Sequence, residues 1–169
     1  QYDGTLDFMH INNMDVIASS SADAPTTTTF GTYGSDINTN GETLISYVWT
    51  DVPGFSRFGR FTGNQNANGP VSYLGFKPAL VILKNADLSA PWFIFDSTRD
   101  PENPIRFNLN PNNNEVEEDD TNGTWDWFAE AIKMTSAGTY PNKSTNKVLY
   151  MAWAESPFAN LYGGQANAK

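Results

Sequence analysis

Apolar and polar residues alternate with a period of two along most of this chain. Residues 43–49 (TLISYVW) and 148–153 (VLYMAW) are rich in β-branched and aromatic side chains, which is typical of strands. Residues 79–84 form an apolar run typical of a buried strand, and residues 86–91 turn the chain into a further strand at 92–96. Shorter strands are predicted at 56–62, 105–109 and 131–135.

Turn residues separate these predicted strands. Two stretches, 19–29 and 110–123, are expected to be long loops, and only residues 124–131 could form a helical turn. The pattern therefore predicts an all-β fold, an antiparallel β-sandwich with long loops. Asn-Gly pairs, which tolerate positive φ at tight turns, stand at 40–41, 68–69 and 122–123.

The sequence also contains a partial internal repeat. Residues 34–53 align without a gap with residues 138–157, and residues 4–8 (GTLDF) resemble residues 123–127 (GTWDW). The first copy is longer between these two motifs, most simply through an enlarged 19–29 loop. The aligned pairs include Trp49 with Trp153, Asp51 with Glu155 and Pro53 with Pro157.

The order of the repeated motifs bears on domain organisation. The complete unit spans residues 55–158, whereas residues 1–53 hold only the counterpart of its second half. A unit without its leading hairpin cannot bury one face alone. We therefore expect a single β-sandwich domain over 1–169, in which the half-repeat 1–53 either completes the core or follows a hairpin that lies upstream. Because the chain begins with Gln1, we expect a processed chain or a piece of a longer protein.

Composition narrows the classes of partner. Of the 169 residues, 39% are hydrophobic and only 17% are charged, so the chain can fill a core, and the net charge is −9. The ten cations are dispersed, which argues against nucleic acid and anionic membranes as partners. The absence of cysteine excludes disulfides and thiolate chemistry. No apolar run approaches the roughly 20 residues of a membrane span.

Four motifs follow one another along the chain: VPGFSRFG at 52–59, YLGFKPALV at 73–81, WFIFDSTR at 92–99 and YMAWAESPF at 150–158. In this order they resemble a β-rich domain family that recurs in tail fibres and related virion proteins of tailed phages. The resemblance covers residues 52–158 well and the N-terminal half-repeat more weakly.

The resemblance implies a virion structural protein at the virion surface. We expect a tail-fibre or receptor-binding module that acts in assembly and host attachment, with other virion proteins and a host surface glycan as partners. Fibres of this kind are usually symmetric homo-oligomers, commonly trimers. A capsid decoration protein and a carbohydrate-binding, lectin-like module are the alternatives. No catalytic residues are established for the family, and we expect a protein that is not an enzyme.

Four residues are candidates for ligand binding. Trp125 and Trp127 flank Asp126 beside the long acidic loop, and exposed rings there could stack on sugars. Asp96 and Arg99 follow a predicted strand and could grip a hydroxyl or a carboxylate. The alternatives are that the tryptophans belong to the core and that the Asp–Arg pair closes a turn.

Two acidic segments raise the question of a metal. Asp36, Asn38 and Asn40 have the alternating oxygen ligands that open a calcium loop, but Tyr47 stands where a bidentate acid is required. A hairpin turn explains the same residues. The acidic run at 115–120 could bind a divalent cation, or it is a solvated loop. We expect no cofactor, with calcium as the alternative.

Hydrolase chemistry is the remaining hypothesis. A glycosidase needs two carboxyl groups about 5–10 Å apart, and Asp51 with Glu155 or Asp126 with Glu130 are the pairs to consider. As repeat equivalents at strand ends, Asp51 and Glu155 favour a structural role. His10 is the only histidine, and no nucleophile–base set can be built around it.

Overall fold

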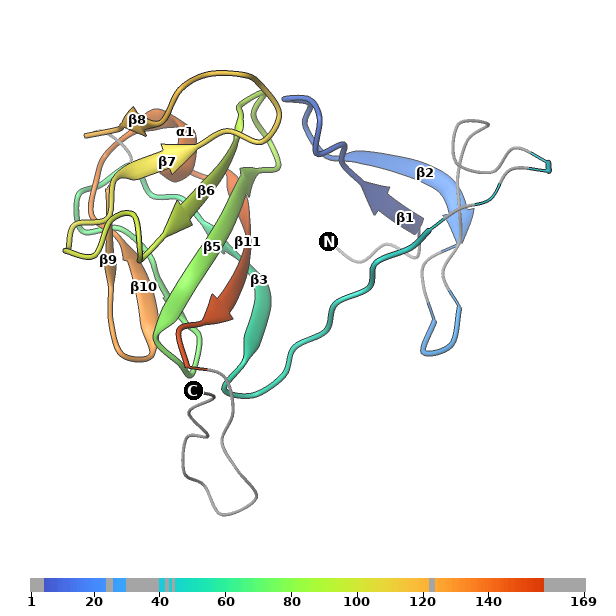
Figure 1. The fold of residues 1–169 in the computed structure, drawn as a ribbon. Coiled ribbons are helices and arrows are strands. Elements are labelled where there is room, and N and C mark those ends of the chain that lie inside the picture. Colours follow the sequence, from blue (N-terminus) through green and yellow to red (C-terminus); the bar gives the residue numbers. More distant parts are fainter. Residues whose placement is uncertain are drawn as a thin grey trace, which may run out of the picture. The chain divides into compact units, whose positions relative to one another are not determined.

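The computed structural model describes residues 5–23, 26–29, 40–41, 43, 45–121 and 124–156. Strands dominate these residues, and the helix among them is α1 (Thr139–Asn142), of four residues. The predicted all-β fold is confirmed. The chain divides into two compact units, which are described separately below (Figure 1). One comprises Gln1–His10 and Ile17–Trp49, and the other comprises Ile11–Val16 and Thr50–Lys169.

The first unit contains an antiparallel pair of strands. β1 (Thr5–Phe8) pairs with β2 (Ala18–Asp23). The hydroxyl of Ser19 donates a hydrogen bond of 2.6 Å to the carboxylate of Asp7 on the facing strand. The prediction of a loop from residue 19 was therefore wrong for the part that pairs as β2.

The second unit contains a six-stranded antiparallel sheet in the order β3-β11-β5-β6-β7-β8. Strand β11 lies between β3 and β5 and pairs with both of them along its length. The sheet consists of β3 (Ser56–Thr62), β5 (Pro78–Asn85), β6 (Trp92–Asp96), β7 (Phe107–Leu109), β8 (Glu118–Asp119) and β11 (Lys147–Ala154).

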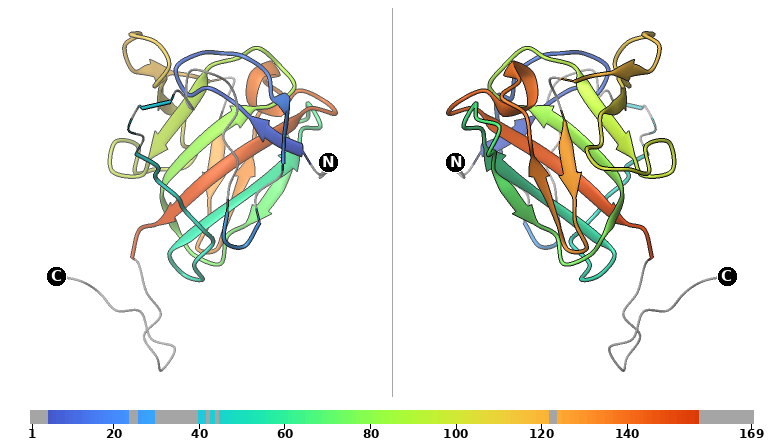
Figure 2. Two further views of the ribbon diagram at one scale, coloured as in Figure 1. Left: turned by 90° about the vertical axis from the view of Figure 1, so that its right-hand side faces the viewer. Right: turned by 90° about the vertical axis from the view of Figure 1, so that its left-hand side faces the viewer.

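A three-stranded sheet in the order β4-β10-β9 covers one face of the larger sheet (Figure 2). It is built from β4 (Val71–Tyr73), β9 (Trp125–Trp127) and β10 (Ala131–Met134). Side chains of the two facing layers fill the core. The larger sheet contributes Phe61, Val81, Leu83, Phe93, Phe95, Val148, Tyr150 and Ala152, and the smaller one contributes Trp125, Trp127, Ile132 and Met134.

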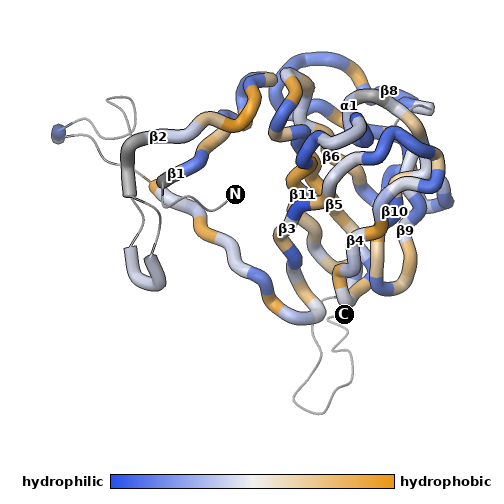
Figure 3. The backbone as a smooth tube through the Cα atoms, turned by 180° about the vertical axis from the view of Figure 1, so that it is seen from behind, coloured by the Kyte–Doolittle hydropathy of each residue, from blue (hydrophilic) through white to orange (hydrophobic). Residues whose placement is uncertain are grey.

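Alternation along β11 shows why its sequence forms a central strand. Val148, Tyr150 and Ala152 are buried in the core, whereas the residues between them point to the other face and are half-buried. Tyr150 lies directly over Gly59 of β3, where an added Cβ would lie 2.5 Å from the tyrosine oxygen. Much of this part of the backbone has the colour of hydrophobic residues in Figure 3.

Most of the strand predictions hold. The strands expected at 56–62, 79–84, 92–96, 131–135 and 148–153 are found as β3, β5, β6, β10 and β11. The strand expected at 105–109 is shortened to β7, with an isolated bridge between Ile105 and Trp125.

Two of the predicted elements were wrong. Residues 124–131 form no helical turn, because β9 and the start of β10 occupy them. Residue 43 and residues 45–50 form no strand. Their large apolar side chains are exposed, and no ladder within the described residues includes them.

The three Asn-Gly pairs have different outcomes. Asn40 and Gly41 form a turn in which Gly41 has φ +89°. Gly69 does not adopt positive φ; instead its added Cβ would lie 2.6 Å from the carbonyl oxygen of Met134, so close approach requires glycine here. The pair at 122–123 lies outside the described residues.

In the part of the chain that the structure describes, no helix is both long enough and apolar enough to cross a membrane.

Candidate functional site

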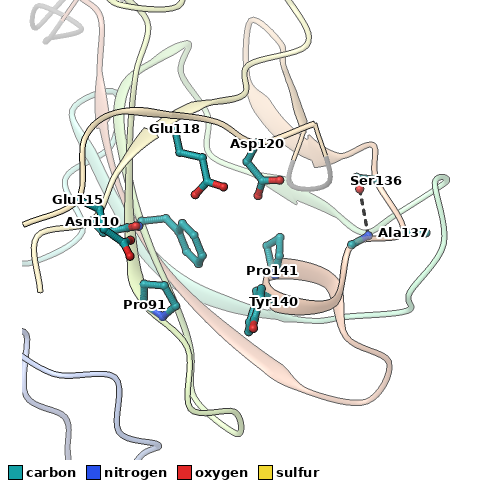
Figure 4. A pocket seen from close by; sticks show the side chains of 11 residues that line it. Pro91, Asn110, Glu115, Glu118, Asp120, Ser136, Ala137, Tyr140 and Pro141 are labelled. Atoms are coloured by element: carbon teal, nitrogen blue, oxygen red, sulfur yellow. Dashed lines mark hydrogen bonds between the residues drawn. The ribbon is translucent and has the colours of Figure 1, made fainter. Parts of the chain in front are cut away.

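A pocket of about 560 Å³ lies where the 110–120 segment faces α1 (Figure 4). Carboxylates line one side of it, and a tyrosine and a proline of α1 line the other. The lining residues are Pro91, Phe93, Asn110, Glu115, Glu118, Asp120, Ser136, Ala137, Gly138, Tyr140 and Pro141. We call this the acidic pocket.

Alternation along β8 explains how the acidic run divides. Neighbouring side chains of a strand point to opposite faces, so Glu118 and Asp120 line the pocket while the acids next to them do not. The acidic run is therefore divided between the pocket and the opposite face of the strand. The acids on the other face pair with arginines, Glu117 with Arg99 and Asp119 with Arg106.

Two buried asparagines hold in place the side of the acidic pocket that contains Tyr140. Asn85 donates a hydrogen bond of 2.8 Å to the carbonyl oxygen of Tyr140. Asn142, which is fully buried, donates to the carbonyl oxygens of Asn66 and Ser136 and accepts from the amide of Asn64. These bonds fix the short helix, while the Tyr140 side chain stays 51% exposed.

The floor of the acidic pocket is rigid as well. Phe93 is buried in the core. The Asn110 side chain donates hydrogen bonds of 3.0 Å to the carbonyl oxygen of Trp92 and 3.3 Å to the Asn108 side chain. The backbone amide of Trp92 in turn donates 2.8 Å to Asn112. Because buried polar groups form these bonds, the 110–112 segment is anchored to β6.

The chemistry of the acidic pocket suits a ligand rich in hydroxyl groups. Its carboxylates accept hydrogen bonds, and the exposed ring of Tyr140 offers an apolar face for stacking. Among the described residues that line the pocket, the charged ones are all acidic. An anionic ligand is accordingly disfavoured.

No group of three or more His, Cys, Asp or Glu side chains within the described residues could hold a metal ion. Of the predicted calcium ligands, Asp36 and Asn38 lie outside the described residues, and Asn40 is exposed in a turn. The calcium expectation for these three residues stays a prediction.

The expectation that Trp125 and Trp127 are exposed was wrong. They are 1% and 7% exposed and belong to the core. The Trp125 ring packs edge-to-face on Phe61 at 5.6 Å and lies 6.2 Å from Phe95. β9 is an edge strand of the smaller sheet, and both of its tryptophans belong to the core, where an aromatic ring buries a large apolar area.

Asp96 and Arg99 serve the local structure. One oxygen of Asp96 accepts hydrogen bonds from the amides of Thr98 (2.7 Å) and Arg99 (3.3 Å), which closes the turn after β6. The Arg99 side chain donates to the carbonyl oxygen of Ile94 (3.1 Å) and pairs with Glu117. Neither residue lines the acidic pocket.

The carboxyl groups considered for hydrolysis form other interactions. Asp51 pairs with Arg57 at 3.1 Å, and its repeat equivalent Glu155 pairs with Lys77 at 2.7 Å. Glu130 accepts a hydrogen bond of 3.1 Å from Tyr73, which together with its charge raises the pKa of that phenol. The His10 ring packs edge-on against Phe8 at 5.5 Å.

A family model matches most of this chain. Residues 3–157 match the model of a family described as a domain of unknown function, DUF7483. The chain belongs to this family. No curated protein and no solved structure matches the chain. The match includes the N-terminal half-repeat as well as the complete unit, so the family domain contains both.

The sequence indicated one wall of the acidic pocket in this family member and missed the other. The 115–120 run was visible as the densest charge of the chain. Tyr140 and Pro141 were not identified, because only the bonds of Asn85 and Asn142 place them opposite the acids. The available signal was an aromatic residue and a proline together in a short polar segment after a strand.

Proposed function

We propose that this protein is an attachment and assembly module of a phage virion surface, of the tail-fibre or receptor-binding kind, and that the acidic pocket binds a host saccharide. The motifs at 52–59, 73–81, 92–99 and 150–158 support the virion setting through their resemblance to tail-fibre domains. The proposal assigns the protein a binding role without a catalytic step.

One observation supports saccharide binding above all. The acidic pocket combines an exposed aromatic ring, Tyr140, with hydrogen-bonding groups on the facing wall, Glu118 and Asp120. Sugar rings stack their apolar faces on aromatic side chains, while their hydroxyl groups donate to carboxylates. Because the asparagines on both sides are buried and hydrogen-bonded, little ordering is required on binding.

The test is binding of the purified chain to an array of bacterial surface saccharides, followed by calorimetry on the saccharides that bind. Tyr140→Ala and Glu118→Gln should each weaken binding at least about tenfold, which corresponds to about 1.4 kcal/mol. Glu102→Gln is the matched control, since this exposed acid does not line the acidic pocket.

Either of two results would refute the saccharide site. One is that no saccharide binds, and the other is that Tyr140→Ala and Glu118→Gln bind as tightly as the Glu102→Gln control. Repeating the titration in EDTA separates a calcium-dependent site from a direct one. Loss of binding in EDTA would support the lectin-like alternative with calcium.

A further inference from the structure

Residues 45–49 carry a run of exposed apolar side chains. Ile45, Tyr47, Val48 and Trp49 are 78%, 75%, 79% and 60% exposed. The rings of Tyr47 and Trp49 stack on each other with centroids 6.3 Å apart. Such runs on a protein surface usually mark a contact with another chain or domain.

The repeat identifies the structure that this sequence forms when neighbours are available. Residues 43–50 align with β11, the strand that pairs with β3 on one side and β5 on the other. There, Ala152, the counterpart of Val48, is fully buried. Trp153, the counterpart of Trp49, packs edge-on against Phe58 at 5.6 Å.

A second correspondence extends the match. The sequence aligns β1 with β9, and each of these strands pairs antiparallel with the strand that follows it in the chain. Residues 1–53 thus contain a counterpart of the β9–β10 hairpin and a counterpart of β11. They contain no second copy of the segment that forms β3 to β8.

The free edge of β3 in the same chain is not suited to pair with residues 43–50. An isolated antiparallel bridge joins Val52 to Ser56 on that edge. The next backbone amide along this edge is that of Phe58, which donates a hydrogen bond of 2.7 Å to the carboxylate of Asp51. Asp51 also pairs with Arg57. A charged side chain that occupies an edge amide blocks addition of a strand.

We propose that residues 43–50 form the central strand of a second sandwich, between β3-like and β5-like strands of a different repeat unit of this family, which is neither residues 55–158 of this chain nor those of a second copy. The segment would then bury the same face as β11, with Val48 in the position of Ala152. This inference extends the assembly part of the proposed function and does not use the acidic pocket. The two proposals can therefore fail separately.

The packing of Tyr150 adds a detail about that partner unit. Tyr150 fits only because β3 has glycine at position 59, and its counterpart is Ser46. A smaller side chain at this place leaves room that the partner must fill. The β3-like strand of the partner unit should therefore carry a residue larger than glycine where β3 has Gly59.

A tandem chain tests the proposal. A copy of residues 51–121 is fused directly ahead of Gln1 of the full chain, so that a leading half precedes the half-repeat. A second version also carries Leu6→Trp and Ser46→Tyr, the residues that the complete unit has at the aligned positions 125 and 150. These substitutions fill the space that the copied strands would otherwise leave.

Hydrogen exchange measured by mass spectrometry gives the readout. Amides of residues 45–50 should exchange at least about 100-fold more slowly in the substituted tandem chain than in the original chain. Val48→Asp in the tandem chain should remove this protection, because it places a charge where the counterpart Ala152 is buried. Saccharide binding should be the same in all of these chains.

Three outcomes would overturn the proposal. The first is fast exchange of residues 45–50 in both tandem chains. The second is protection in the original chain that does not vary with concentration, since these residues would then pair within their own chain. The third is protection that rises with concentration of the original chain, which would identify a second copy as the partner.

Discussion

Residues 45–50 and β11 carry nearly the same pattern of side chains and differ completely in structure. β11 lies between two strands, and its inward residues Val148 and Ala152 are fully buried. In the aligned segment Val48 is 79% exposed, and residues 45–50 form no strand. The comparison shows that β-branched and aromatic residues do not form a strand by themselves. They favour a strand where neighbouring strands provide a pleated, half-buried surface to pack against.

Replacement of the aligned pair Ala152 and Val48 by aspartate should produce the largest contrast. Ala152→Asp puts a charge between β3 and β5 in the core and should cost more than about 4 kcal/mol of unfolding free energy. Val48→Asp should cost less than about 0.5 kcal/mol, because the side chain is exposed. Urea denaturation followed by circular dichroism measures both. Equal losses would show that the two segments have the same environment.

A second contrast concerns Gly59 and the tyrosine above it. Gly59→Ala places a methyl group against the Tyr150 ring, which is buried and cannot move away freely. We expect a loss of about 2 kcal/mol, typical of an overpacked core. Adding Tyr150→Ser, the residue of the aligned position 46, should make Gly59→Ala much less harmful.

A double-mutant cycle in urea isolates this coupling. The double mutant should lose less unfolding free energy than the sum of the two single mutants, by about 1 kcal/mol or more, because Tyr150→Ser relieves the clash. An additive cycle would mean that the cost of Gly59→Ala does not come from contact with the Tyr150 ring.

The sequence predicted those strands whose neighbours lie on both sides or whose runs are long. β5 and β11 are eight residues each, and their apolar alternation is unambiguous. Residues 43–49 have the same alternation, but a strand also needs neighbouring strands to pair with. The local sequence pattern does not indicate whether these neighbours are present. β9 is only three residues long, so its period could not be distinguished from a helical turn.

The candidate site was predictable in part for a similar reason. The acids at 115–120 were evident, but which of them face the acidic pocket depends on the pairing of β8 with β7. The burial of Trp125 and Trp127 follows from the closure of two sheets, and the Asn103 side chain pairs with the backbone of Trp127 at 2.9 and 3.0 Å. Such contacts join residues that are distant in the sequence.

A third prediction concerns Lys84, which lies next to Leu149 of β11 in the ladder. It is fully buried, and its ammonium group donates to the carbonyl oxygens of Asn85 (2.7 Å), Leu88 (3.4 Å) and Met14 (3.5 Å). Lys84→Met leaves these oxygens without that donor and should cost about 1–2 kcal/mol near pH 7. No residue of the 45–50 segment has a comparable role.

The pH dependence gives a further test of Lys84. Burial lowers the pKa of its ammonium group in the folded state, and the charge of Asp15 opposes this. Between the lowered pKa and the ordinary value of 10.5, the unfolded chain holds more protons than the folded one. Stability due to Lys84 therefore rises with pH across that window. Urea midpoints should show the rise in the original chain and not in Lys84→Met.

The smallest expected effect concerns the ion pairs that close the two aligned segments. Asp51 pairs with Arg57 and Glu155 pairs with Lys77, and all four side chains are between 43% and 57% exposed. Because solvent and salt screen such pairs, Asp51→Asn and Glu155→Gln should each lower the unfolding free energy by less than about 1 kcal/mol. The effect of Asp51→Asn should be the larger of the two, since its carboxylate also accepts a hydrogen bond from the amide of Phe58.

Denaturation at low and at high salt separates the contributions of the ion pair and of this hydrogen bond, because screening removes the ion pair and leaves the hydrogen bond. A larger loss for Glu155→Gln would contradict the view that Asp51 caps the edge of β3.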